Sequence, residues 1–249
     1  MLLANGTDHF IPHLSLDCVV FGFHDNQLRV LLLKLPFEEP MALPGGYVLN
    51  HESLEDAAQR VLLERTGLTG VFLQQFHTFS NPGRINTNFP ETTLKKFGFS
   101  TSDIAWLSSR FVTVGFYALV DYMRAVPTPD LFSVSCGWHD LSDIGVLMMD
   151  HNNILDKALE TLRLHLNYQP VGLNLLPEKF TIPELQRLYE TILGQKLDRR
   201  NFQRRIKSFN ILEDLHERKT GVAHKAPGLY RFGLRNYNLA LKHGIRGGW

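Results

Sequence analysis

Two short stretches of this 249-residue chain hold the side chains whose types and spacing could do chemistry. Residues 44–68 join a Gly-Gly turn to a helical pattern that mixes carboxylates with guanidiniums. Residues 198–207 form a second helical pattern in which half of the positions are Arg or Lys. Carboxylates on one helix face can hold a divalent metal against a diphosphate, whereas an Arg-rich helix suits DNA phosphates and base edges. The two stretches therefore point to hydrolysis and to nucleic-acid binding, respectively.

The helix of the first stretch has clear ends. Ser53 predicts an N-cap, Asp56 supplies the acid of a capping box, and Gly67 ends the helix. The glycine–loop–helix unit resembles the Nudix box, which has a Gly, five residues, a Glu, seven residues and then Arg-Glu-aliphatic-x-Glu-Glu-x-Gly-aliphatic. The residues in register with that box are Gly46, Glu52, Arg60, Leu62, Glu64, Gly67 and Leu68.

Three positions of the box normally carry the carboxylates that hold metal, and two of them differ here. They are occupied by Val61, Glu64 and Arg65. A hard cation needs several oxygen ligands, and a guanidinium beside Glu64 pairs with it and repels the metal. We therefore expect the fold of the box without its hydrolytic chemistry, and we predict no catalytic residue, no metal site and no cofactor.

Composition indicates an ordinary globular protein, with 44% hydrophobic and 20% charged residues. Cys18 and Cys136 are its only cysteines, which excludes a disulfide framework. No signal peptide precedes the first expected strand and no apolar run reaches membrane-spanning length, so we expect a cytoplasmic protein with no membrane partner.

The net charge of +1 hides a strong asymmetry between the two ends of the chain. Residues 176–249 contain 15 Lys or Arg against 7 Asp or Glu, whereas residues 1–175 contain 11 against 18. This division is typical of an acidic ligand domain joined to a nucleic-acid-binding domain. The alternative is a merely solvated basic face.

The order of patterns along the chain predicts two domains. After a leader (residues 1–13), residues 14–168 predict an α/β Nudix-fold sandwich. Residues 85–108 are expected to form an insertion with a short helix after Pro90, which serves as a pocket lid or as part of a dimer contact. The expected strands and helix of this domain are residues 16–23, 28–35 (after a turn at Asp25-Asn26), 71–79, 111–121 and 153–166.

The second domain is expected to be a small α+β winged helix-turn-helix domain. A capping box at Thr181 and Glu184 opens one helix, and Asp198 caps the next. Helix, turn, helix and hairpin in this order are typical of the winged helix. The expected segments are a linker (169–177), the domain (178–235, with helices 182–193 and 198–209 and strands 211–217 and 229–232) and a tail (236–249).

The second helix of this domain predicts double-stranded DNA binding. Phe202, Ile206 and Phe209 form its buried stripe, so most of the cations face the opposite side. Arg and Gln on the exposed face can bind guanine and adenine, and neighbouring cations can bind phosphates. The predicted DNA-binding residues are Arg199, Arg200, Gln203, Arg204, Arg205 and Lys207, with Arg218, Lys219, His224 and Lys225 in the hairpin wing. Single-stranded RNA binding ranks lower because no stacking aromatics accompany these residues.

With both halves taken together, the chain resembles the Nudix-related transcriptional regulators. The second half of the resemblance lies in NLLPEKFTIPELQRLYETILGQKLDRRNFQRRI, residues 174–206. The resemblance implies a homodimeric bacterial regulator of palindromic operator DNA that is released by a small molecule, either a sugar such as arabinose or an ADP-ribose-like nucleotide. A sugar is slightly favoured because the segment His77–Arg84, which resembles a nucleotide-binding loop, is not followed by Asp-Pro-Arg. The alternative function is a Nudix hydrolase of ADP-ribose or NADH with an appended basic domain.

The candidates for binding the small molecule are Asp17, Lys34, Arg84 and Arg110. Asp17 either bonds a sugar hydroxyl or faces solvent at the edge of the sheet, and Lys34 ends another strand. Arg84 is expected to meet a phosphate or a ribose, with Arg110 in a similar role. His151 is expected to cap a helix rather than to bind a ligand.

Overall fold

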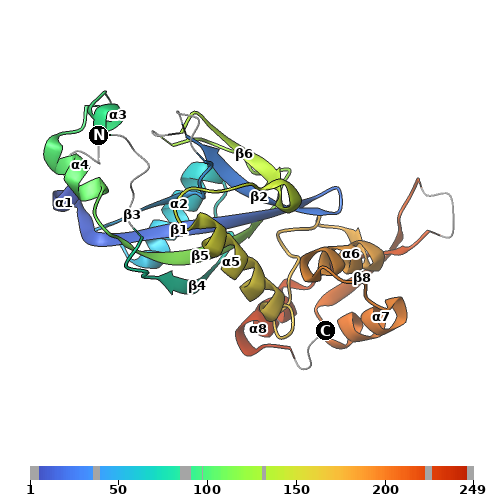
Figure 1. Ribbon diagram of the computed structural model, residues 1–249. Helices are drawn as coiled ribbons and strands as arrows, with labels where there is room; N and C mark the ends of the chain where they lie inside the picture. The colour runs from blue at the N-terminus through green and yellow to red at the C-terminus, as the bar shows by residue number, and fades with distance from the viewer. Residues whose placement is uncertain are drawn as a thin grey trace. The chain divides into compact units, whose positions relative to one another are not determined.

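The computed structural model describes residues 6–35, 40–84, 91–96, 98–130, 133–221 and 226–245 (Figure 1). These residues form two compact units. The first contains described residues within 1–21, 29–119 and 124–158, and the second contains those within 22–28, 120–123 and 159–249. No helix among the described ranges has the length and hydropathy needed to cross a membrane.

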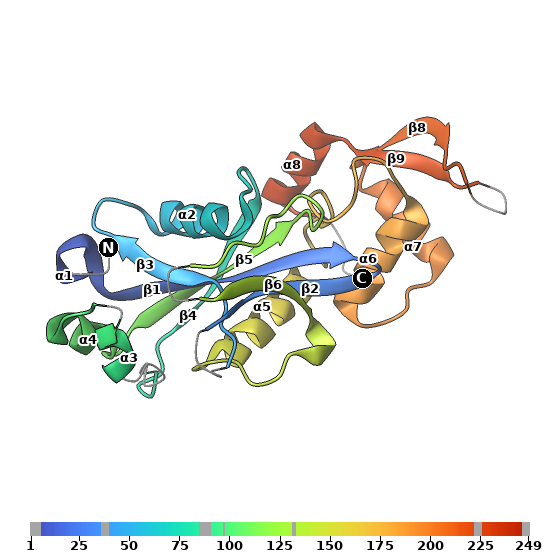
Figure 2. The same ribbon diagram turned by 90° about the horizontal axis from the view of Figure 1, so that it is seen from above.

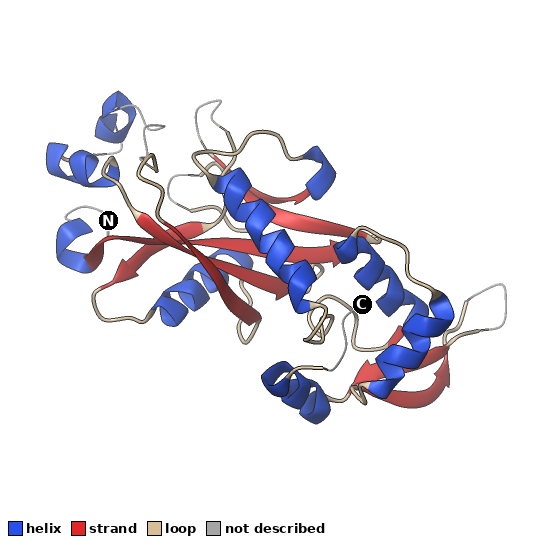
Figure 3. Ribbon diagram, turned by 60° about the horizontal axis from the view of Figure 1, so that its bottom comes forward, coloured by secondary structure: helices blue, strands red, loops and turns tan. Residues whose placement is uncertain are grey.

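The first unit is built on a six-stranded sheet in the order β4-β5-β1-β2-β6, with β3 paired to β1. Helix α2 (Leu54–Thr66) covers one face and α5 (His151–His165) the other, as Figure 2 shows; the strands are red in Figure 3. This is the predicted Nudix-fold sandwich. The strands are β1 (Phe10–His24), β2 (Gln27–Lys34), β3 (Gly45–Leu49), β4 (Phe72–Phe79), β5 (Val112–Val120) and β6 (Ser135–Asp140), the last followed by the short 3-10 helix η1 (Leu141–Asp143).

Local signals in the sequence account for the ends of these elements. Asp25 and Asn26 both adopt positive φ in the predicted turn between β1 and β2. The capping box of α2 is present, with Ser53 and Asp56 bonded to each other's backbone N–H. Gly67 ends the helix in the left-handed region at φ 70°, and its N–H donates to the Leu63 carbonyl.

The segment predicted as a leader contributes to the fold. Helix α1 (Gly6–His9) precedes β1, and β1 begins at Phe10, earlier than the sequence predicted. Phe10 is buried because its ring stacks on Trp106 at 5.9 Å. This long-range contact explains why no local pattern revealed the start of the strand.

The predicted insertion contains two helices. Helix α3 (Glu91–Lys96) follows Pro90 as predicted, and α4 (Thr101–Leu107) opens with its own capping box. Residues 85–90 lie outside the described residues. Leu94 and Leu107 of these helices join Phe10 and Phe111 in one buried cluster. The described part of the insertion is therefore packed onto the sheet domain.

The second unit has the predicted winged-helix order. Its three-stranded sheet is ordered β7-β9-β8. Helix α6 opens with the predicted capping box of Thr181 and Glu184 and ends at Gly194. The elements are β7 (Phe180–Thr181), α6 (Ile182–Leu193), α7 (Arg199–Ser208), β8 (Leu212–Arg218), β9 (Gly228–Phe232) and α8 (Leu234–His243).

Two flanking segments differ from their expected roles as linker and tail. Within residues 169–177, Val171 is buried and its N–H donates to the Tyr189 hydroxyl at 3.2 Å. Helix α8 occupies most of the predicted tail, where Tyr237 packs on Phe232 and donates to the Pro170 carbonyl at 2.9 Å. Both segments therefore belong to the packed core of the second unit.

Candidate functional site

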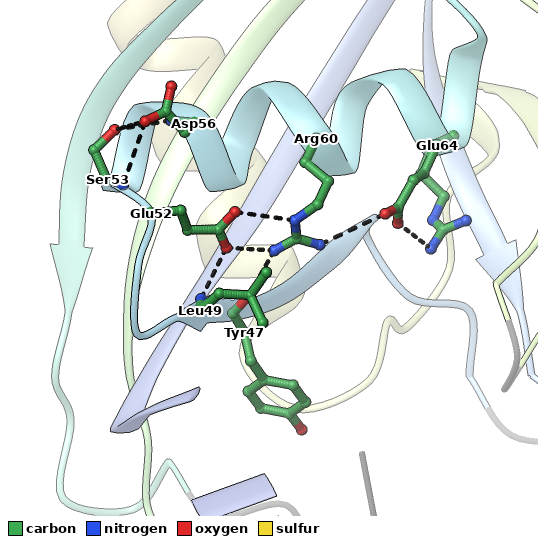
Figure 4. Close-up of polar contacts among 8 residues, drawn as sticks. Tyr47, Leu49, Glu52, Ser53, Asp56, Arg60 and Glu64 are labelled. Atoms are coloured by element: carbon green, nitrogen blue, oxygen red, sulfur yellow. Dashed lines mark hydrogen bonds and ion pairs between the residues drawn. The ribbon is translucent and has the colours of Figure 1, made fainter. Parts of the chain in front are cut away.

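The box residues form a closed hydrogen-bond cluster, drawn in Figure 4. Arg60 donates to both carboxylate oxygens of Glu52, at 3.1 and 2.6 Å, and to the Tyr47 carbonyl at 3.0 Å. The Leu49 N–H also donates to Glu52, at 2.8 Å. Burial by itself would raise the pKa of Glu52, but the hydrogen bonds from Arg60 and Leu49 outweigh it and hold that pKa below its ordinary value. The cluster thus fixes the loop between β3 and α2.

Glu64 lies between two guanidiniums. Its carboxylate is 3.6 Å from Arg60 Nη1 and 3.4 Å from Arg65 Nη2. Val61, on the same helix, is 1% exposed and packs toward Gly46. Within the described ranges, no group of three or more His, Cys, Asp or Glu side chains is placed to hold a metal ion. Glu64 is part of an ion-paired helix face.

Strand β3 separates this box from a cavity on the other side of the sheet. The Cα of Gly46 faces Val61 of α2, so its neighbours Gly45 and Tyr47 face the opposite way. A Cβ on Gly45 would lie 2.6 Å from Asp17 Oδ1, so only glycine fits at that position. In Figure 4 the Tyr47 ring points away from the Glu52–Arg60 cluster.

The cavity has a volume of about 170 Å³. Its wall includes residues from β1, β2, β3 and the start of α5, and its described lining contains no residue of α2. The insertion, predicted as a pocket lid or as part of a dimer contact, contributes Leu94 and Leu107 to the lining, and Phe111 follows it. The lining residues that matter below are Asp17, Tyr47, Arg84, Leu94, Leu107, Phe111, Asp130 and His151.

A buried ionic network forms one end of the cavity. Arg84 Nη2 lies 2.7 Å from Asp17 Oδ2, and its Nε donates to both oxygens of Asp150, at 2.9 and 3.1 Å. The Thr113 hydroxyl donates to Asp17 Oδ2 at 2.9 Å. Asp17 and Arg84 are each only 6% exposed. A charge buried this deeply is tolerated because it is paired.

His151 completes this end of the cavity. Its Nδ1 accepts a hydrogen bond from the Leu43 N–H at 3.0 Å, which places the ring proton on Nε2, 3.6 Å from Asp17 Oδ1. Burial lowers the pKa of His151, an effect that the nearby Asp17 only partly offsets, so the ring is neutral at pH 7. His151 starts α5 as expected, but its ring nitrogen accepts from Leu43 and not from a helix N–H, so the expected side-chain cap is wrong.

The structure brings together two of the four predicted small-molecule residues. Asp17 and Arg84 meet in the cavity. Lys34 is exposed at the end of β2, and Arg110 is exposed with its Nη2 on the Ser80 carbonyl at 2.6 Å; neither lines the cavity. No ligand role was predicted for Tyr47. It lies among the box residues, and the sequence does not show that its side chain faces the cavity. Asp150, which pairs with Arg84, was likewise not predicted as part of a site.

Helix α7 presents an exposed basic face. Phe202 and Ile206 are buried as predicted, and Phe209 is half-buried just after the helix. The helix itself contains no acidic residue. Arg204 donates to Asn201 at 2.9 Å, and Lys207 lies over the Tyr230 ring at 5.4 Å. The predicted DNA-binding residues of this helix are exposed (Arg199, Arg200, Gln203, Arg204 and Lys207) or half-buried (Arg205).

The predicted wing cations are more constrained than those of the helix. Arg218 donates to the Ala226 carbonyl at 2.9 Å, and Lys219 forms an ion pair with Glu184. His224 and Lys225 lie outside the described residues. The basic face of α7 is therefore the main candidate for contact with a polyanion.

The fold and these sites define a class: a Nudix-fold domain joined to a winged-helix domain. A family model of the NUDIX domain matches residues 12–162, and one described as the NrtR DNA-binding winged helix domain matches residues 172–232. The chain belongs to the Nudix-related transcriptional regulators that share this pair of domains.

Relatives match nearly the whole chain. A curated relative from Acinetobacter baylyi, described as an ADPR responsive transcriptional repressor, is 30% identical over 94% of this chain and 87% of its own length. The crystal structure of Shewanella oneidensis NrtR complexed with a 27mer DNA is 26% identical, with a TM-score of 0.73, and covers 95% of this chain and 99% of that one. A second crystal structure of Shewanella oneidensis NrtR is 27% identical, with a TM-score of 0.74, and covers 95% of this chain and 100% of that one.

Proposed function

We propose that this protein is a transcriptional repressor that binds operator DNA through α7 and is released by a small molecule bound in the Nudix-fold domain. The observation that carries the proposal is the exposed, acid-free basic face of α7 in a winged-helix unit. The full-length similarity to the NrtR structure with DNA supports the same role. A DNA-binding role of this kind belongs to the cytoplasm.

ADP-ribose is the first candidate for the effector. The Acinetobacter baylyi relative is described as ADPR-responsive and matches 94% of this chain. A free sugar such as arabinose is the second candidate, because the cavity is small and its one lining cation among the described residues, Arg84, is already paired. Direct comparison of the two compounds distinguishes these effectors.

We propose regulation without hydrolysis. Val61 is apolar and buried, and Glu64 is paired with Arg60 and Arg65, so a metal would have to displace two guanidiniums to reach it. The protein incubated with magnesium and ADP-ribose or NADH is expected to release no product. Turnover that Glu64→Gln abolishes would contradict this part of the proposal.

DNA binding by a homodimer is the expected arrangement, because two-fold symmetric proteins match palindromic half-sites. Light scattering on the full chain checks the dimer. Fluorescence anisotropy with upstream DNA should find one palindromic site bound far more tightly than random duplex, with ADP-ribose or arabinose weakening that complex. Equal affinity for random duplex and for every upstream fragment would overturn the proposed function.

A further inference from the structure

The cavity presents several polar atoms that the protein leaves available. Asp17 Oδ2 is used by Arg84 and Thr113, but Oδ1 faces His151 Nε2 at 3.6 Å, too far for a hydrogen bond. The Tyr47 hydroxyl has no hydrogen-bond partner among the described residues, although the side chain lines the cavity. Together these groups offer an acceptor, a donor and a hydroxyl that can do either.

The charge of this end of the cavity opposes an anionic ligand. Arg84 is bonded to two carboxylates, those of Asp17 and Asp150, and His151 is neutral, so the network carries a net charge of −1. A phosphate placed here would meet this net negative charge, whereas a neutral hydroxyl donates to Asp17 without such repulsion.

The size and walls of the cavity point the same way. Its volume of about 170 Å³ is below the roughly 300–1,000 Å³ of pockets that enclose a drug-sized ligand. The lining also includes apolar side chains of one buried cluster, Leu94, Leu107 and Phe111. One face of the ring of a five-carbon sugar is less polar than the other, and the ring also carries several hydroxyls. Such a ligand suits a cavity lined by both apolar and polar side chains.

We propose that this cavity binds a pentose group of the effector, with its hydroxyls bonded to Asp17 Oδ1, the Tyr47 hydroxyl and His151 Nε2–H, and with any phosphate held outside it. The inference rests on the proposed effector role and specifies which part of the ligand enters. It also places that part on the face of β3 opposite the box helix, away from Glu64.

The test is isothermal titration of the full-length protein with ADP-ribose, ADP and L-arabinose. ADP lacks the terminal ribose of ADP-ribose but keeps the adenosine ribose, so their comparison tests whether the terminal ribose is the pentose that enters the cavity. Tyr47→Phe removes one hydroxyl and keeps the ring that packs on Phe10, Trp106 and Phe111. Tyr168→Phe, at an exposed ring outside the cavity, is the matched control.

We expect the wild type to bind ADP-ribose or L-arabinose. Tyr47→Phe should lower the affinity for whichever of the two binds by roughly tenfold. Tyr168→Phe should match the wild type. If ADP-ribose is the probe that binds, ADP should bind at least tenfold more weakly. Unchanged affinity in Tyr47→Phe, ADP affinity equal to that of a bound ADP-ribose, or no binding of either sugar-bearing probe would each overturn the inference. Operator binding measured on the same samples reports separately on the proposed function, and a thermal melt verifies that both variants are folded.

Discussion

Helix α2 carries two arginines and helix α7 carries four, and the two helices use them in opposite ways. In α2, Arg60 and Arg65 are bonded to Glu52 and Glu64 within the same unit. In α7 the cations extend from a helix that contains no acidic residue, and Arg204 donates to the neutral side chain of Asn201. A guanidinium that is neutralised internally fixes a loop, whereas one without a carboxylate remains available to a polyanion. Helix α2 therefore serves the scaffold of its domain, whereas α7 presents a surface suited to binding.

The largest effect is expected where a buried charge would lose its partner. Arg84→Met leaves Asp17 and Asp150 without their cation, so the free energy of unfolding should fall by about 3–5 kcal/mol. Urea denaturation measures it. Arg110→Met, at an exposed arginine, should change stability by less than about 0.5 kcal/mol. Equal losses in the two variants would show that Arg84 does not hold the network together.

A smaller effect, on binding rather than stability, is expected on α7. Arg204→Ala should weaken specific operator binding by about 1–3 kcal/mol if Arg204 contacts a guanine. Because Arg204 is exposed, the unfolding curve of the Arg204→Ala variant should match that of the wild type. Arg124→Ala removes an equally exposed cation from the first unit and should leave the affinity unchanged. If both variants lost the same affinity, the loss would be due to the change in net charge and not to a base contact of Arg204.

Salt dependence distinguishes free from paired cations. Arg199→Ala should reduce the slope of log K against log[salt] by about 0.9 if Arg199 contacts one phosphate. Lys219→Ala should reduce it less, because Lys219 is already paired with Glu184. Anisotropy titrations between low and moderate salt give both slopes. A larger change for Lys219 would mean that the wing, rather than α7, dominates phosphate contact.

The smallest effect concerns pH. The pKa of His151 is lowered in the folded protein because burial disfavours its charged form, so the unfolded chain binds the extra proton more readily. Its contribution to stability is complete above its ordinary pKa of 6.5 and is lost as the pH falls toward the folded value. The stability of His151→Gln should therefore decline less between pH 7 and pH 5. Parallel curves for wild type and variant would exclude this linkage.

Local chemistry is the part of this fold that the sequence determined. The capping boxes of α2 and α6, the glycines that end both helices and the buried stripe of α7 depend on residues within a few positions of one another. Hydrogen bonds and packing over one or two helical turns leave a readable pattern. The charge division between the two halves was equally visible.

Only tertiary structure decided the cavity. Asp17, Tyr47, Arg84 and His151 come from four separate segments, and no local spacing relates them. The pairing of β3 with β1 sets Gly45 opposite Asp17, and the alternation of β3 then directs Tyr47 away from the box. The sequence therefore specified which helices form and where they end. Long-range strand pairing decided which side chains meet, because a contact across the sheet depends on register rather than on sequence distance.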